Sequence, residues 1–166
     1  MVFGTRIPAV SLTLALLASV LWTTGCDTGT TKNEAQYQAL QGTWEIVNLE
    51  IAGVSFTTET RARYDSLQVT FRSTAGGKTY TLHGEKDAQN TLIASGSVTI
   101  LDAPQSLALT RGPETVILTY DITQSRRAML AVPRGRLNGS NVFLQLLLPN
   151  GAWSGSPSAE LRLERL

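Results

Sequence analysis

From Gly42 onward the chain consists of short runs in which apolar and polar residues alternate. Residues 67–72 alternate without an error, and the alternation resumes at residues 79–82 after a stretch that contains two glycines, residues 75–77. A period of two places successive side chains on opposite faces of a strand, and glycine adopts the positive φ angles of tight turns. These two runs therefore predict a β-hairpin.

Similar runs recur to the end of the chain and predict about nine strands. The predicted strands cover residues 43–52, 67–72, 79–82, 95–101, 106–111, 115–123, 127–132, 141–148 and 159–165. A short helix is expected over residues 33–40, with Asn33 as its N-cap, and no helix of about ten residues is expected after it. Short strands joined by turns predict an all-β fold, either an antiparallel barrel or a β-sandwich.

The first residues of the chain have a different composition. Residues 7–22 contain no charge and follow the single basic residue Arg6. This apolar stretch is shorter than the roughly 20 residues that a membrane-spanning helix needs, and it fits the hydrophobic region of a secretion signal. It ends in small residues before Cys26, the only cysteine of the chain.

The sequence Thr23-Thr24-Gly25-Cys26 resembles the lipobox of bacterial lipoproteins, although Thr23 stands where those proteins usually have leucine. The resemblance implies that residues 1–25 are a removable leader and that the Cys26 thiol carries lipid. Residues 26–35 would then be a lipidated, flexible tether, and residues 36–166 a single domain. A membrane-anchored protein of the bacterial cell envelope is expected, at the outer membrane rather than the inner one.

A Gly-x-Trp motif, Gly42 to Trp44, stands where the chain passes from the predicted helix into the first strand. This arrangement resembles lipocalins, which are eight-stranded, antiparallel up-and-down β-barrels. The resemblance implies that Trp44 closes one end of the barrel and packs against an arginine of the last strand, either Arg162 or Arg165. Another small barrel or a β-sandwich is the alternative.

No combination of residues predicts an enzyme, a metal site or a cofactor. His83 is the only histidine and is expected to be a surface or turn residue, and with one cysteine it cannot assemble a zinc site. Without the leader, which carries Arg6, the chain keeps 13 basic residues against 13 acidic ones, scattered along it. The arginines of residues 126–127 and 134–136 are expected in solvated turns, so nucleic acid is not an expected partner.

Two functions remain open for the predicted domain, which we expect to be a monomer. It could bind a small apolar or amphipathic ligand at the barrel end opposite Trp44, where Trp153 could act as a lid. Alternatively, it could be an envelope interaction or inhibitor module with a filled barrel. The barrel interior distinguishes the two functions. Large side chains that point inward, at Phe71, Tyr80, Leu118 and Tyr120, would fill the barrel, whereas a cavity of several hundred Å³ would favour a ligand.

Overall fold

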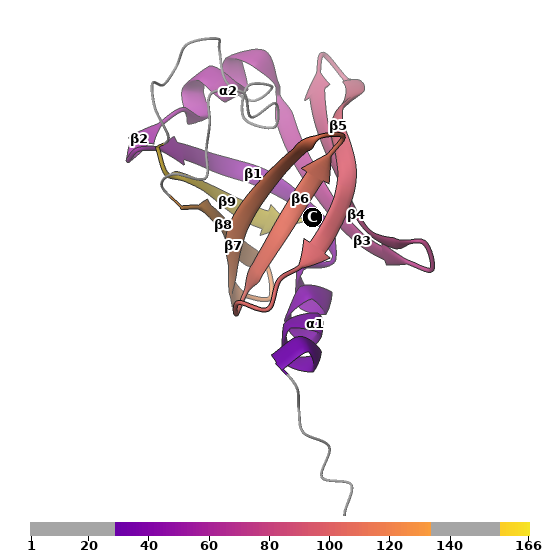
Figure 1. The fold of residues 1–166 in the computed structure, drawn as a ribbon. Helices are drawn as coiled ribbons and strands as arrows, with labels where there is room; N and C mark the ends of the chain where they lie inside the picture. The colour runs from indigo at the N-terminus through magenta and orange to yellow at the C-terminus, as the bar shows by residue number, and fades with distance from the viewer. Residues whose placement is uncertain (1–28, 134–156) are drawn as a thin grey trace, which may run out of the picture.

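The computed structural model describes residues 29–133 and 157–166, which form a closed antiparallel barrel (Figure 1). In chain order its strands are β1 (Gly42–Ile51), β3 (Ser66–Thr74), β4 (Gly77–Lys86), β5 (Gln89–Ile100), β6 (Ser106–Arg111), β7 (Glu114–Gln124), β8 (Arg127–Val132) and β9 (Ala159–Arg165). The two-residue strand β2 (Val54–Ser55) adds to β1 outside the ring, which leaves eight strands of the 9-stranded sheet in the barrel. The prediction of an all-β, lipocalin-like up-and-down barrel is confirmed, and the predicted strand at residues 141–148 lies outside the described residues.

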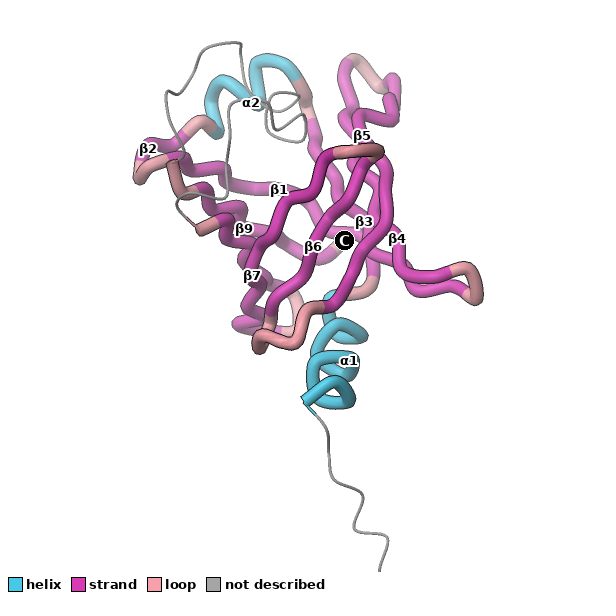
Figure 2. The backbone as a smooth tube through the Cα atoms, in the orientation of Figure 1, coloured by secondary structure: helices cyan, strands magenta, loops and turns pink. Residues whose placement is uncertain are grey.

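The barrel closes where β9 pairs with β1, from Trp44 opposite Arg165 to Ile51 opposite Ala159. On its other side, β1 pairs with β3 over residues 42–45 alone. Beyond this point the two strands separate, and the helix α2 (Thr57–Arg63) lies at that end of the barrel (Figures 1 and 2). The sequence did not predict α2, because its residues contain no apolar period that would mark a buried helical face.

The helix α1 (Gly29–Leu40) lies at the opposite end of the barrel (Figure 1). Two sequence predictions are wrong here, the N-cap at Asn33 and a flexible tether as far as residue 35. Asn33 lies within α1, and its Nδ2 donates hydrogen bonds to the carbonyl oxygens of Leu101 (3.1 Å) and Asp102 (3.2 Å). Glu34 pairs with Lys78 at 3.0 Å. These contacts fix the helix to the β5–β6 loop and to β4, so residues 33–35 belong to the domain.

The predicted hairpin around residues 75–77 is the β3–β4 hairpin, with Thr74 opposite Gly77, whose φ is 119°. The next hairpin, β4–β5, projects beyond the barrel at the end that holds α2 (Figures 1 and 2). Its turn residues Asp87 and Ala88 have φ angles of 52° and 60°. Asp65, which follows α2, accepts hydrogen bonds there from the Asp87 backbone N–H (2.8 Å) and the Lys86 ammonium (3.0 Å). These two bonds hold the pKa of the Asp65 carboxyl below its usual value.

Candidate functional site

In lipocalin-like barrels a ligand site lies in the barrel interior. The side chains that decide between a cavity and a filled core are all buried. Phe71, Tyr80, Leu118 and Tyr120 are between 1 and 3 % exposed. Other large, fully buried side chains among the described residues include Tyr37, Leu40, Trp44, Leu49, Leu82, Leu107 and Leu130. The interior is therefore packed with the protein's own side chains.

One end of the barrel is closed by Trp44 and α1. The indole Nε1–H of Trp44 donates a hydrogen bond of 2.7 Å to the carbonyl oxygen of Leu40, the last residue of α1. The guanidinium carbon of Arg165 lies 4.9 Å from the centre of the Trp44 ring, and its Nη2 donates to the carbonyl oxygens of Ala39 and Gln41. The guanidinium thus stacks on the indole and links β9 to the end of α1.

Gly42 completes this arrangement. Its φ of 123° is one that other residues rarely adopt, and a Cβ at this position would lie 3.3 Å from Nη2 of Arg165. Of the two candidate arginines, Arg165 and not Arg162 contacts Trp44. The signal that separates them was present in the sequence, because Leu161 and Leu163 face the core and the period of two places residue 165 on their side.

Three tyrosines, Tyr37 of α1, Tyr80 of β4 and Tyr120 of β7, lie in the core. Burial, and then the charge of Glu34, raises the pKa of Tyr37 to about 12, and its hydroxyl donates to the carbonyl oxygen of Arg72 at 3.3 Å. Burial also raises the pKa of Tyr80 and Tyr120. All three phenols therefore stay protonated at neutral pH, and none of them can act there as a base or nucleophile. Within the described part of the chain the Tyr120 hydroxyl has no hydrogen-bond partner.

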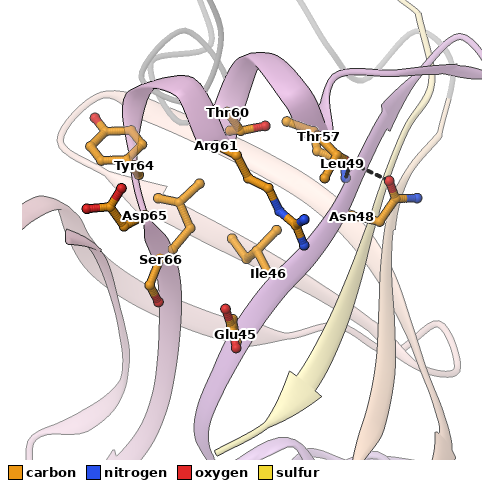
Figure 3. Close-up of a pocket in the computed structure, with 11 residues that line it drawn as sticks. Glu45, Ile46, Asn48, Leu49, Thr57, Thr60, Arg61, Tyr64, Asp65 and Ser66 are labelled. Atoms are coloured by element: carbon orange, nitrogen blue, oxygen red, sulfur yellow. Dashed lines mark hydrogen bonds between the residues drawn. The ribbon is translucent and has the colours of Figure 1, made fainter. Parts of the chain in front are cut away.

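A small crevice lies at the opposite end, where β1 and β3 separate beneath α2 (Figure 3). Its volume is about 20 Å³, which is room for roughly one water molecule. Thr57, Thr60, Arg61 and Tyr64 line it from α2 and the residue that follows the helix, and the remaining lining residues are Glu45, Ile46, Asn48, Leu49, Asp65, Ser66 and Leu67. Figure 3 shows the Arg61 side chain extending from α2 towards β1. The crevice is polar at its rim and too small for a fatty acid or a sugar.

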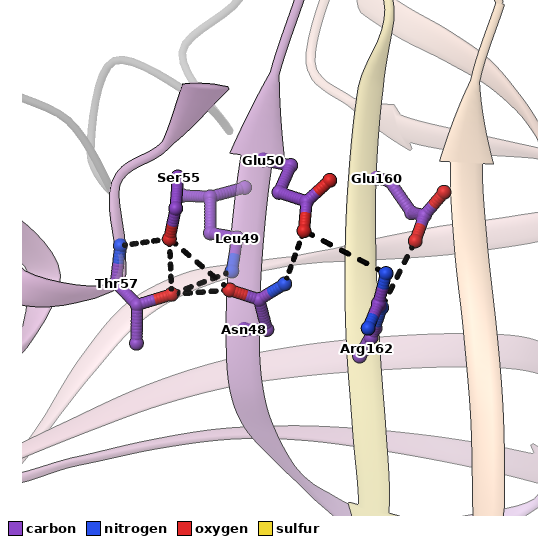
Figure 4. Close-up of polar contacts among 7 residues, drawn as sticks. All are labelled: Asn48, Leu49, Glu50, Ser55, Thr57, Glu160 and Arg162. Atoms are coloured by element: carbon purple, nitrogen blue, oxygen red, sulfur yellow. Dashed lines mark hydrogen bonds and ion pairs between the residues drawn. The ribbon is translucent and has the colours of Figure 1, made fainter. Parts of the chain in front are cut away.

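A polar network on the outer wall fixes the start of α2 to the barrel (Figure 4). Asn48 accepts hydrogen bonds at Oδ1 from the hydroxyls of Thr57 and Ser55, and its Nδ2 donates to Glu50 at 2.8 Å. Arg162 of β9 pairs with Glu50 at 3.6 Å and with Glu160 at 3.1 Å. Exposed ion pairs each contribute little to the free energy of folding, so we expect this network to position α2 and not to stabilise the barrel.

Of the remaining sequence candidates, His83 and Arg127 lie within the described residues. His83 lies in β4, where its Nδ1 is 2.8 Å from Oδ1 of Asn90 across the hairpin. Arg127 pairs with Glu164 at 3.5 Å. Cys26, Trp153 and the arginines of residues 134–136 lie outside the described residues.

Among the residues that the structure describes, no three His, Cys, Asp or Glu side chains come together as a metal site. Neither described helix is long and apolar enough to cross a bilayer. No protein-family model matches the chain, and a search of curated proteins finds no significant match. The inference of function therefore depends on the geometry of the barrel.

Proposed function

We propose that this protein is a lipid-anchored cell-envelope protein whose filled barrel works through its outer surface, by contact with another protein. The packing of the interior supports this function over the binding of a small molecule. Sites for drug-sized ligands have volumes of about 300–1,000 Å³. The crevice beneath α2, at the end opposite Trp44, measures about 20 Å³. Hollows of about 340–390 Å³ elsewhere in the described part of the chain are open to solvent, and the large interior side chains Phe71, Tyr80 and Leu118 line none of them.

The proposed anchor also sets the orientation of the barrel. Gly29, the first residue of α1, follows Cys26 by three positions, and three residues span at most about 10 Å. A lipid on Cys26 would therefore hold α1, and with it the Trp44 end of the barrel, close to the bilayer. The end with α2 and the β4–β5 hairpin would face the aqueous compartment (Figure 1). A partner in that compartment could reach it.

The anchor is tested by the Cys26→Ser variant, expressed in the native host. We expect the variant to lack acyl chains and to stay unprocessed or to appear in the soluble fraction, because serine offers no thiol for lipid attachment. Membrane fractionation and mass spectrometry of the N-terminus measure both effects. An unmodified Cys26 in the wild-type protein would refute the anchor.

The filled barrel is tested by searching for bound lipid. We expect no fatty acid or lipid fragment to copurify with the folded domain in stoichiometric amount, and titration with a fluorescent fatty acid to give no saturable signal. Extraction followed by mass spectrometry, together with the titration, measures this. Saturable binding that Leu118→Trp abolishes in a folded variant would place a ligand inside the barrel and refute the proposal.

A further inference from the structure

Part of β5 is a free sheet edge. Residues 89–97 of β5 pair with β4, but β6 pairs with residues 97–100 alone and then turns away at Gly112 towards β7. Among the described residues, no strand pairs with residues 89–96 on the side that faces away from β4. A closed barrel has no sheet edge, but the part of the β4–β5 hairpin that projects beyond the barrel has one.

The regular and most accessible part of this edge is residues 89–92, which we call the free edge of β5. Ile93 is an extra residue at a bulge, because Leu82 lies opposite Ala94 whereas His83 lies opposite Leu92. All four residues of the free edge are exposed, and Leu92 keeps 54 % of its surface in contact with solvent. Backbone N–H and C=O groups on such an edge are available to an added strand.

The composition of β5 does not protect this edge. Natural sheet edges usually carry charged residues, especially lysine, or proline, which block pairing with other chains. The sequence of β5, QNTLIASGSVTI, contains neither a charge nor a proline. An uncharged edge that exposes a leucine matches an uncharged strand with apolar side chains, because pairing then leaves no charge without water.

The direction of β5 argues against a second copy of this protein as the partner. The strand begins beside Asp65 at the α2 end, and Leu101, directly after it, accepts a hydrogen bond from Asn33 of α1. β5 therefore begins at the α2 end, which the proposed anchor places away from the bilayer, and ends near α1, close to the bilayer. Antiparallel pairing of two copies of β5 would invert one barrel, which two lipids in the same leaflet do not permit.

We infer that the free edge of β5 binds an extended, uncharged, β-branched segment of a partner protein as an additional antiparallel strand. This inference rests on the proposed function, because the anchor supplies the orientation and the filled barrel leaves the surface as the place of contact. Leu92 provides the apolar contact, and the backbone N–H and C=O groups within residues 89–92 that face away from β4, on every second residue, provide the hydrogen bonds. Main-chain hydrogen bonds give affinity in this mode of recognition, and the side-chain contacts give specificity.

The test uses the mature protein carrying Cys26→Ser and a capped peptide that alternates threonine and valine, acetyl-TVTVTVT-amide. We expect saturable binding with a dissociation constant on the order of 1 mM, and slower hydrogen exchange of backbone amides in residues 89–92. Leu92→Lys should weaken binding at least about tenfold, because it places a charge on the edge. Val54→Lys, which changes a valine that is 58 % exposed on β2, is the matched control and should leave the affinity unchanged.

The inference would be overturned by an absence of peptide binding, by equal weakening in Val54→Lys, or by protection confined to another strand. A peptide in which lysine replaces valine should not bind. If the soluble protein forms dimers that dissociate in the Leu92→Lys variant, the partner is a second copy of this chain, which refutes the inferred partner protein. Failure of the peptide experiment leaves the filled barrel intact, whereas saturable fatty-acid binding inside the barrel refutes the proposed function whatever the peptide does.

Discussion

Replacing Trp44 by alanine is expected to lower the free energy of unfolding by about 3 to 5 kcal/mol, the usual cost of emptying a large aromatic site in a core. Trp44 is fully buried and is the largest buried side chain among the described residues. The substitution also removes the hydrogen bond to the Leu40 carbonyl and the ring on which Arg165 stacks. Chemical denaturation of the two proteins measures the difference.

Trp44→Phe separates these contributions. Phenylalanine keeps an aromatic ring in the core but loses the N–H that bonds to Leu40, so we expect a loss between that of alanine and zero. A loss below about 0.5 kcal/mol for Trp44→Ala would be typical of a surface position and would show that Trp44 does not close the barrel.

The strands that enclose the core are the part of the fold that the sequence predicted best. The predicted strands at residues 106–111, 127–132 and 159–165 have the same bounds as β6, β8 and β9. In β9 one face packs against the core and the other faces solvent, so its sequence alternates. In β6 and β8 every second residue is also buried, although β6 buries four consecutive residues and β8 keeps half-buried apolar residues on its other face. The first strand, predicted at residues 43–52, differs from β1 by one residue at each end.

The β4–β5 hairpin shows where this signal ends. The predicted strands covered residues 79–82 and 95–101, whereas β4 continues to Lys86 and β5 begins at Gln89. Of the additional residues, Ala94 is buried and Ile93 packs against the core, whereas residues 89–92 at the tip of the hairpin are exposed. Burial therefore imposes no alternation on residues 89–92. The free edge of β5 lies at this tip, which is why alternation in the sequence did not predict it.

The two ends of the barrel also differ in how well the sequence predicted them. The Gly-x-Trp motif predicted the closed end, because that end needs particular residue types. Gly42 has a backbone conformation that other residues rarely adopt, and the Trp44 ring stacks on an arginine. The crevice beneath α2 was not predicted, because it forms where β1 and β3 part, and the alternation within one strand does not show how far that strand pairs with its neighbour. Asn33 illustrates a third case, in which long-range hydrogen bonds override a local capping preference.

Replacing Gly96 by alanine is expected to destabilise the barrel by about 3 kcal/mol or more, because the added methyl group has no space. A Cβ at residue 96 would lie 2.0 Å from the carbonyl oxygen of Thr110 in β6 and 2.9 Å from the Tyr80 ring. The first contact is with backbone, which cannot rotate away as a side chain can. To admit the methyl group, β6 must move away from β5 and disturb the neighbouring pair of Ser97 and Thr110.

Gly76→Ala is the matched control for this substitution. A Cβ at Gly76, near the tip of the β3–β4 hairpin, would meet its nearest atom, the Thr74 hydroxyl, at 3.8 Å, an ordinary contact. We expect a change within about 0.5 kcal/mol for this variant, as for most surface substitutions. Chemical denaturation of both variants measures the contrast, and equal stabilities would contradict the close approach of β5 and β6. Ser97, next to Gly96, is the last residue of β5 that pairs with β6, so the close approach at Gly96 lies where the paired part of β5 ends.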